Sequence, residues 1–65
     1  MELRLGKMSS KEMAQWFGIR YTTYKNDIDR YLDKLDVFAD FEKVYGGVII
    51  KEIYISVYDK NVNSL

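Results

Sequence analysis

The sequence predicts a single small α+β domain, in which a short strand is followed by two helices and a β-hairpin. Three observations indicate this order: a helix-capping motif that begins at Ser9, a glycine at position 18 between two helical patterns, and two β-rich stretches around Gly46-Gly47. A chain of 65 residues has room for one domain. We assign residues 1–60 to this domain and residues 61–65 to a flexible tail.

The amino-terminal residues 2–5 alternate between polar and apolar side chains, which is typical of a strand, and Gly6 is expected to end it. A first helix should begin at Ser9. Ser9 and Glu12 have the spacing of a capping box, in which each side chain accepts a hydrogen bond from a free N–H at the helix start. Gly18 should end this helix, because glycine adopts the left-handed cap conformation without steric cost.

A second helix is expected from about Thr22 to Asp36. Its apolar positions recur at steps of three and four residues, as on one face of an amphipathic helix, and comprise Tyr24, Ile28, Tyr31, Leu32 and Leu35. The opposite face is polar. Arg30 has Asp27 and Asp33 three residues away on either side, which favours a local ion pair.

Residues 38–45 and 48–58 are expected to pair as a hairpin, with Gly46-Gly47 as a two-residue turn that needs positive φ. That register places Glu42 opposite Lys51. The apolar residues of the second strand change face along its length, so we expect either a bulge or bend near Glu52, or burial on both faces.

Composition excludes several functions. The chain has no cysteine and no histidine, so it has neither disulfides nor the commonest zinc ligands and general base. Its apolar runs, such as Val48–Ile50, are far shorter than the ~18 residues of a membrane helix. We therefore expect a cytoplasmic protein without a cofactor, metal site or catalytic activity, and we interpret its acidic residues as a solvated face.

Residues 10–29 resemble the helix-turn-helix of DNA-binding regulators. Ala14 stands where that motif has a small residue at the helix crossing, and Gly18 stands at its turn. Ile28 falls one residue beyond the position where the family usually has its last apolar residue. With the preceding strand and the Gly-Gly hairpin, residues 2–58 resemble a winged helix whose wing is the hairpin, although no helix precedes the motif.

The span Ser9–Ile19 is also similar to small or amino-terminal winged domains of phage and mobile-element proteins of Gram-positive bacteria. Such domains often begin longer proteins, so this chain could be one part of a larger protein or a small phage protein. The resemblance implies a regulator, an excisionase-like factor or a replication-origin binder. The hairpin could also supply a homodimer interface.

The resemblance implies that the second helix enters the major groove of duplex DNA. Arg20 could then pair with guanine and Asn26 with adenine, while phosphates could bind at the start of the first helix. The full set of candidate DNA-binding residues is Ser9, Ser10, Lys11, Arg20, Tyr21, Thr22, Thr23, Lys25, Asn26, Lys43 and Lys51.

The charge distribution leaves two functions open. The net charge is zero, which is compatible with a winged helix that binds another protein instead of DNA. However, residues 1–26 contain five basic and two acidic side chains, whereas residues 27–65 contain five basic and eight acidic ones. Because a local positive face is enough to attract DNA, this polarity favours DNA binding.

Overall fold

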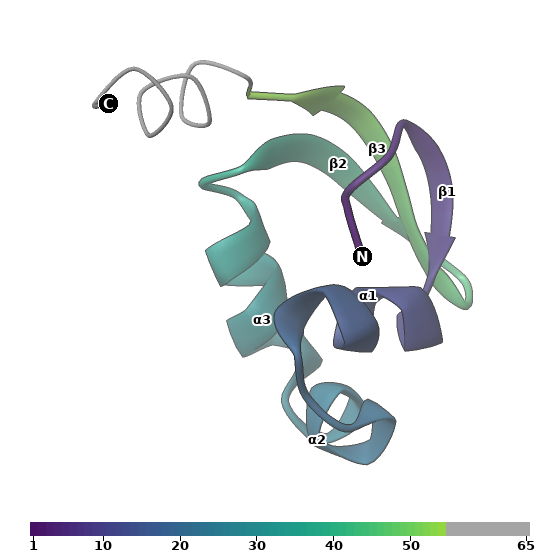
Figure 1. The fold of residues 1–65 in the computed structure, drawn as a ribbon, viewed down its shortest axis with the longest axis vertical. Coiled ribbons are helices and arrows are strands. Elements are labelled where there is room, and N and C mark those ends of the chain that lie inside the picture. Colours follow the sequence, from purple (N-terminus) through teal and green to yellow (C-terminus); the bar gives the residue numbers. More distant parts are fainter. Residues whose placement is uncertain (55–65) are drawn as a thin grey trace.

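The computed structural model describes residues 1–54 and shows a three-stranded sheet with three helices on one side of it, of which the first lies nearest to the sheet and the second farthest from it (Figure 1). In chain order the elements are β1 (Gly6–Ser9), α1 (Ser10–Phe17), α2 (Tyr21–Asn26), α3 (Ile28–Leu35), β2 (Ala39–Val44) and β3 (Gly47–Ile53). The sheet is antiparallel, with the order β1-β3-β2. This is the layout of a winged helix, as the sequence predicts. The expected continuation of the last strand to Tyr58 and the tail at 61–65 lie outside the described residues.

The predicted limits of α1 are confirmed. The Ser9 hydroxyl accepts a hydrogen bond from the Glu12 N–H at 3.1 Å, and the Glu12 carboxylate accepts one from the Ser9 N–H at 2.8 Å. At the other end Gly18 has a φ of 74°, in the left-handed region. The Ile19 N–H donates to the Ala14 carbonyl at 3.0 Å, which closes the last turn.

The position predicted for the first strand is wrong, because β1 begins at Gly6 instead of ending there. The strand is placed by its partner: Gly6 pairs with Ile50 and Ser9 with Gly47. This register points Met8 into the core, where it is fully buried, whereas Leu5 remains 64% exposed. Burial of Met8 therefore selects residues 6–9 over the alternating residues 2–5.

A single helix over residues 22–36 is also wrong, since the helical segment breaks at Asp27 into α2 and α3. Asp27 has a φ of −143°, outside the helical range, and serves as both the end of α2 and the start of α3. Asn26 and Asp27 are poor helix formers that favour caps and turns. The break falls one residue before Ile28, where the sequence departs from the helix-turn-helix spacing. The expected ion pair of Arg30 forms with Asp27, at 3.8 Å.

The hairpin turn lies one residue earlier than predicted. Tyr45 and Gly46 form it, and Gly46 alone of the two central positions has a positive φ, at 78°. Gly47 instead begins β3, paired with Val44 on one side and with Ser9 on the other. A side chain at Gly47 would collide with the backbone carbonyl of Met8. The glycine pair thus meets two different requirements, a turn conformation and a close approach of strands.

The earlier turn shifts the hairpin register, so that Glu42 pairs with Ile49 and not with Lys51. Glu42 and Lys51 still form the predicted ion pair, at 3.5 Å, as diagonal neighbours on the two strands. A bulge is present close to the expected place: Phe41 pairs with Ile50 but Asp40 pairs with Glu52, which leaves Lys51 as the extra residue. The bulge turns Ile53 toward the same core as Ile50.

The core lies between the sheet and the helices and contains a cluster of aromatic rings that joins all three helices. Phe17 packs against Tyr31 at 5.2 Å between ring centres, and Trp16 packs edge-on against Phe38 at 5.3 Å. Tyr24 is fully buried beside Phe17, and its hydroxyl has no hydrogen-bond partner among residues 1–54. Trp16 and Phe17 therefore serve packing.

Within residues 1–54, none of the helices has the length and apolar character needed to cross a membrane.

Candidate nucleic-acid interface

Helix α2 presents a nearly continuous exposed surface. From Arg20 to Asn26 every residue is exposed except Tyr24, which points into the core and fixes the orientation of the helix. Tyr24 thus anchors the helix, while the five other residues of α2 and its N-cap Arg20 are exposed. The exposed candidates brought together here are Arg20, Tyr21, Thr22, Thr23, Lys25 and Asn26.

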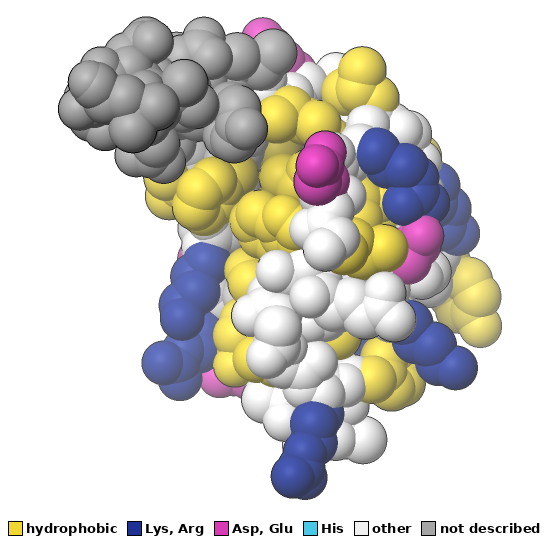
Figure 2. Space-filling view, viewed as in Figure 1, with side chains coloured by type: hydrophobic (Ala, Val, Ile, Leu, Met, Phe, Trp, Pro, Cys, Tyr) yellow, Lys and Arg dark blue, Asp and Glu magenta, His cyan; other side chains and the backbone are white. Residues whose placement is uncertain are grey.

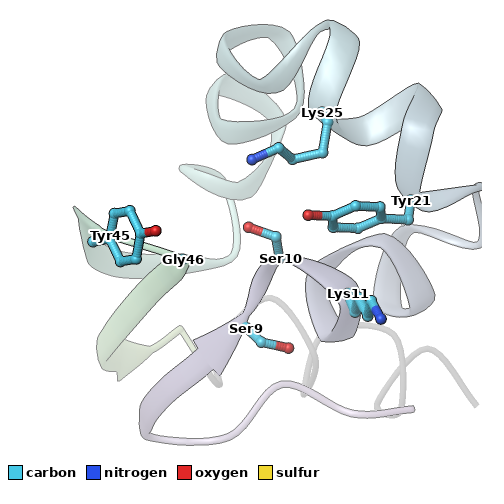
Figure 3. Close-up of a pocket in the computed structure, with 7 residues that line it drawn as sticks. All are labelled: Ser9, Ser10, Lys11, Tyr21, Lys25, Tyr45 and Gly46. Atoms are coloured by element: carbon cyan, nitrogen blue, oxygen red, sulfur yellow. The ribbon is translucent and has the colours of Figure 1, made fainter.

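A surface hollow of about 400 Å³ lies beside α2, where the start of α1 meets the β2–β3 turn (Figure 3). It is lined by Ser9, Ser10, Lys11, Tyr21, Lys25, Tyr45 and Gly46. Five of these seven residues are candidates predicted from the sequence. Three segments that are distant in the sequence therefore contribute to one place on the surface.

Backbone contacts hold the β2–β3 turn beside α1. The Ser10 N–H donates to the Gly46 carbonyl at 3.0 Å, and the ammonium of Lys7 donates to the Tyr45 carbonyl at the same distance. The close pairing of Gly47 with Ser9 brings the strands into position for both contacts. The tip of the hairpin is consequently fixed relative to the first turn of α1.

The start of α1 offers fewer free N–H groups than the sequence suggests. The Ser10 N–H is bonded to Gly46 and the Glu12 N–H to the Ser9 hydroxyl, which leaves the Lys11 N–H without a partner among the described residues. Ser9 is occupied by capping. The Ser9 N–H, followed by the guanidinium of Arg4 at 2.7 Å, holds the pKa of the Glu12 carboxyl below its ordinary value.

The side chains around the hollow are basic and polar. The ammonium groups of Lys11 and Lys25 each lie 5.9 Å from the centre of the Tyr21 ring, a distance at which a cation is attracted to an aromatic face. No acidic residue lines the hollow. Within the described part of the chain, Lys11, Arg20 and Lys25 form no ion pair. In Figure 2 basic side chains project at several places on this face, one of them at the end of the molecule that α2 forms.

Lys43 and Lys51, predicted as contacts of the wing, are placed away from this hollow. Lys43 lies 3.7 Å from the carboxylate of Asp29 on α3, and Lys51 lies 3.5 Å from that of Glu42. Neither lines the hollow. Both ion pairs are solvent-exposed and therefore weak, but each places an acidic group beside the lysine.

The hairpin residues nearest to the hollow, Tyr45 and Gly46, are not among the residues predicted from the sequence. Tyr45 is 98% exposed at the tip, and its carbonyl binds Lys7. The glycine pair marks the turn in the sequence. Its position against α1, however, depends on the pairing of β1 with β3, for which the sequence contains no local signal.

Comparison of the chain with protein-family models, with curated proteins and with solved structures gives no match.

Proposed function

We propose that this protein is a DNA-binding module that places α2 in the major groove of a duplex. The observation that carries the proposal is the exposed surface of α2, from Arg20 to Asn26, beside a hollow lined by lysines and by no acidic residue. Binding of duplex DNA depends strongly on local positive charge, because cations on the protein displace counterions from phosphates. The winged-helix layout is compatible with this mode of binding.

The proposed roles follow from the chemistry of the exposed side chains. The guanidinium of Arg20 can donate two hydrogen bonds to guanine, and the amide of Asn26 can both donate to and accept from adenine. Thr22 and Thr23 lie between them and can contact a phosphate or a thymine methyl group. In the cytoplasm such a module would serve a regulator, an excisionase-like factor or a replication-origin binder, alone or within a longer chain.

The positions of the lysines in the structure change the residues that we propose for the wing contact. Lys43 and Lys51 are each beside an acidic residue, whereas Lys7 lies next to the exposed tip of the hairpin. We therefore assign the wing contact to Lys7 and Tyr45, which would meet the sugar–phosphate backbone. This contact positions the protein without reading sequence.

The test is selection from a pool of random duplexes with the purified protein, followed by measurement of the enriched sequence with variants. Arg20→Ala should relax the preference at one base pair by about 1–3 kcal/mol, because it removes a base contact. Lys11→Ala should instead weaken binding to all sequences alike. Lys34→Ala, on α3 outside the hollow, is the control and should leave affinity unchanged.

A second function, binding of another protein by the same surface, is favoured by the net charge of zero and by the exposed Tyr45. Enrichment of one duplex motif would support the DNA-binding proposal, and a palindromic motif would indicate a homodimer. Failure to enrich any sequence, together with binding that does not weaken at high salt, would overturn DNA binding in favour of the second function.

A further inference from the structure

We propose that the hollow between α1, α2 and the β2–β3 turn is a site for one phosphate group of the DNA backbone. This inference rests on the proposed DNA-binding function and adds to it a defined anion site. The residues that would hold the phosphate are Ser10, Lys11, Tyr21 and Lys25. They are brought together only in the folded chain, as Figure 3 shows.

The first argument is the state of the Ser10 side chain. Ser10 is only 6% exposed, yet its hydroxyl forms no hydrogen bond with any other described residue. Ser10 lines the hollow, and in Figure 3 its hydroxyl lies below the ammonium of Lys25 and points away from the Tyr21 ring. The hydroxyl is not enclosed by the protein, so a ligand oxygen in the hollow can reach it as solvent does. A ligand oxygen in the hollow would supply the missing partner.

The second argument is the charge of the groups that face the same space. The ammonium of Lys25 and the hydroxyl of Tyr21 are both directed toward it from α2 (Figure 3). The free N–H of Lys11 belongs to the first turn of α1, where the helix dipole favours an anion. All these groups are hydrogen-bond donors and none is an acid. The site therefore fits a tetrahedral oxyanion, and a phosphodiester is the anion that a duplex presents.

The third argument is the position of the hollow. Its Tyr21 and Lys25 come from the same helix as Arg20 and Asn26, the proposed base contacts. A phosphate bound here would fix how far α2 enters the groove. Because the Ser10 N–H also binds the Gly46 carbonyl, the same anion would be held next to the tip of the hairpin. A phosphate bound at this site would therefore fix where α2 and the hairpin tip contact the same duplex.

The test is a scan of the selected duplex with methylphosphonates, which replace one backbone charge at a time by a neutral group. In the natural protein, one linkage next to the proposed α2 contact should lower affinity about tenfold when it is neutralised, because a charge-assisted hydrogen bond is lost. In Ser10→Ala and in Lys25→Gln, neutralising that linkage should have a much smaller effect. Lys34→Gln is the matched control and should retain the full tenfold response.

The two proposals fail in different ways. If the natural protein binds the duplex but every linkage responds alike in it and in both variants, the phosphate site is wrong and DNA binding stands. If the natural protein binds no duplex, both proposals are overturned. Lys25 is exposed, so Lys25→Gln keeps the test informative even if Ser10→Ala perturbs folding.

Discussion

At the scale of single residues, the hydroxyls of Tyr24 and Ser10 both lack a hydrogen-bond partner among the described residues, but only that of Tyr24 is enclosed by the protein. The hydroxyl of Tyr24 is enclosed in the aromatic cluster, where no ligand can reach it, and burial raises its pKa. The hydroxyl of Ser10 opens into the surface hollow. An unsatisfied buried polar group costs about 1–3 kcal/mol. The hydroxyl of Tyr24 therefore lowers stability, whereas the hydroxyl of Ser10 is open to water or to a ligand and does not carry this cost.

Replacing Tyr24 by phenylalanine should leave the free energy of unfolding unchanged or raise it by up to about 1 kcal/mol, since the ring is kept and the unpaired hydroxyl is removed. Urea denaturation followed by circular dichroism measures this. Tyr31→Phe, in the same cluster but only half buried, is the comparison. A loss of more than about 1 kcal/mol in Tyr24→Phe would mean that the hydroxyl has a partner, such as an internal water.

The Glu12 carboxylate should make stability depend on pH in the acid range. Its pKa is lowered in the folded state by the Ser9 N–H and then by Arg4, so its contribution is present above its ordinary value of 4.5 and is lost as the pH falls through the lowered pKa. We expect Glu12→Gln to be less stable than the natural protein at neutral pH, with a gap that narrows below pH 4.5.

Urea titrations at a series of pH values provide the measurement for Glu12, with Glu2→Gln as a control that should track the natural protein. Glu2 is exposed and forms no ion pair among the described residues. If the difference in free energy of unfolding between Glu12→Gln and the natural protein stayed constant down to the pH of acid unfolding, the stabilisation by Glu12 would not depend on its charge.

At the scale of elements, the two turn glycines explain how the hairpin reaches the hollow. Gly46 provides the positive φ of the turn, and Gly47 lets β3 approach Met8 closely enough for the turn to meet the start of α1. The helices show a similar division. α2 is short and exposed, and α3, beyond the break at Asp27, buries Leu32 and Leu35. α2 therefore presents exposed side chains to solvent, whereas α3 packs against the core.

Alanine substitutions should separate the roles of the two glycines. Gly46→Ala should cost roughly 1–2 kcal/mol of stability, the strain of a side chain in the left-handed region. Gly47→Ala should cost at least about 2 kcal/mol, because its β-carbon would collide with backbone and not with a movable side chain. Thermal or urea unfolding compares the two, and a greater loss for Gly46→Ala would contradict the observed strand pairing.

At the scale of the whole molecule, a chain of zero net charge carries a group of exposed basic side chains around α1 and α2. The unpaired cations Lys11, Arg20 and Lys25 gather around α1 and α2, whereas Lys43 and Lys51 are beside acidic groups elsewhere. Such a surface suits a compact contact with DNA. It does not suit a protein around which the duplex wraps.

The salt dependence of duplex binding should therefore be moderate. With about three phosphates neutralised, the logarithm of the binding constant should fall with the logarithm of salt concentration at a slope of about −3. Lys25→Gln should reduce the steepness by about 1, and Lys34→Gln should not change it. Fluorescence anisotropy over a range of salt concentrations measures the slope, and a value steeper than about −6 would require a much larger contact than this surface provides.

The amino-acid sequence by itself determined the features that depend on neighbours within about four residues. These are the capping box at Ser9, the end of α1 at Gly18, the buried Tyr24 among exposed residues of α2, and a bulge near Glu52. Each is encoded by side chains that contact their own backbone or by the period of apolar residues. The sequence pattern did not predict the break at Asp27, because the apolar residues keep their helical spacing across it.

Only the tertiary structure decided which residues meet. The start of β1, the turn at Tyr45-Gly46, the acidic neighbour of Lys43 and the hollow that opens beside Ser10 all depend on contacts between different elements of the fold. The register of the strands is selected by burial of Met8 against β3 and by the close approach at Gly47. Those are contacts across the sheet, and no local pattern in the chain specifies them.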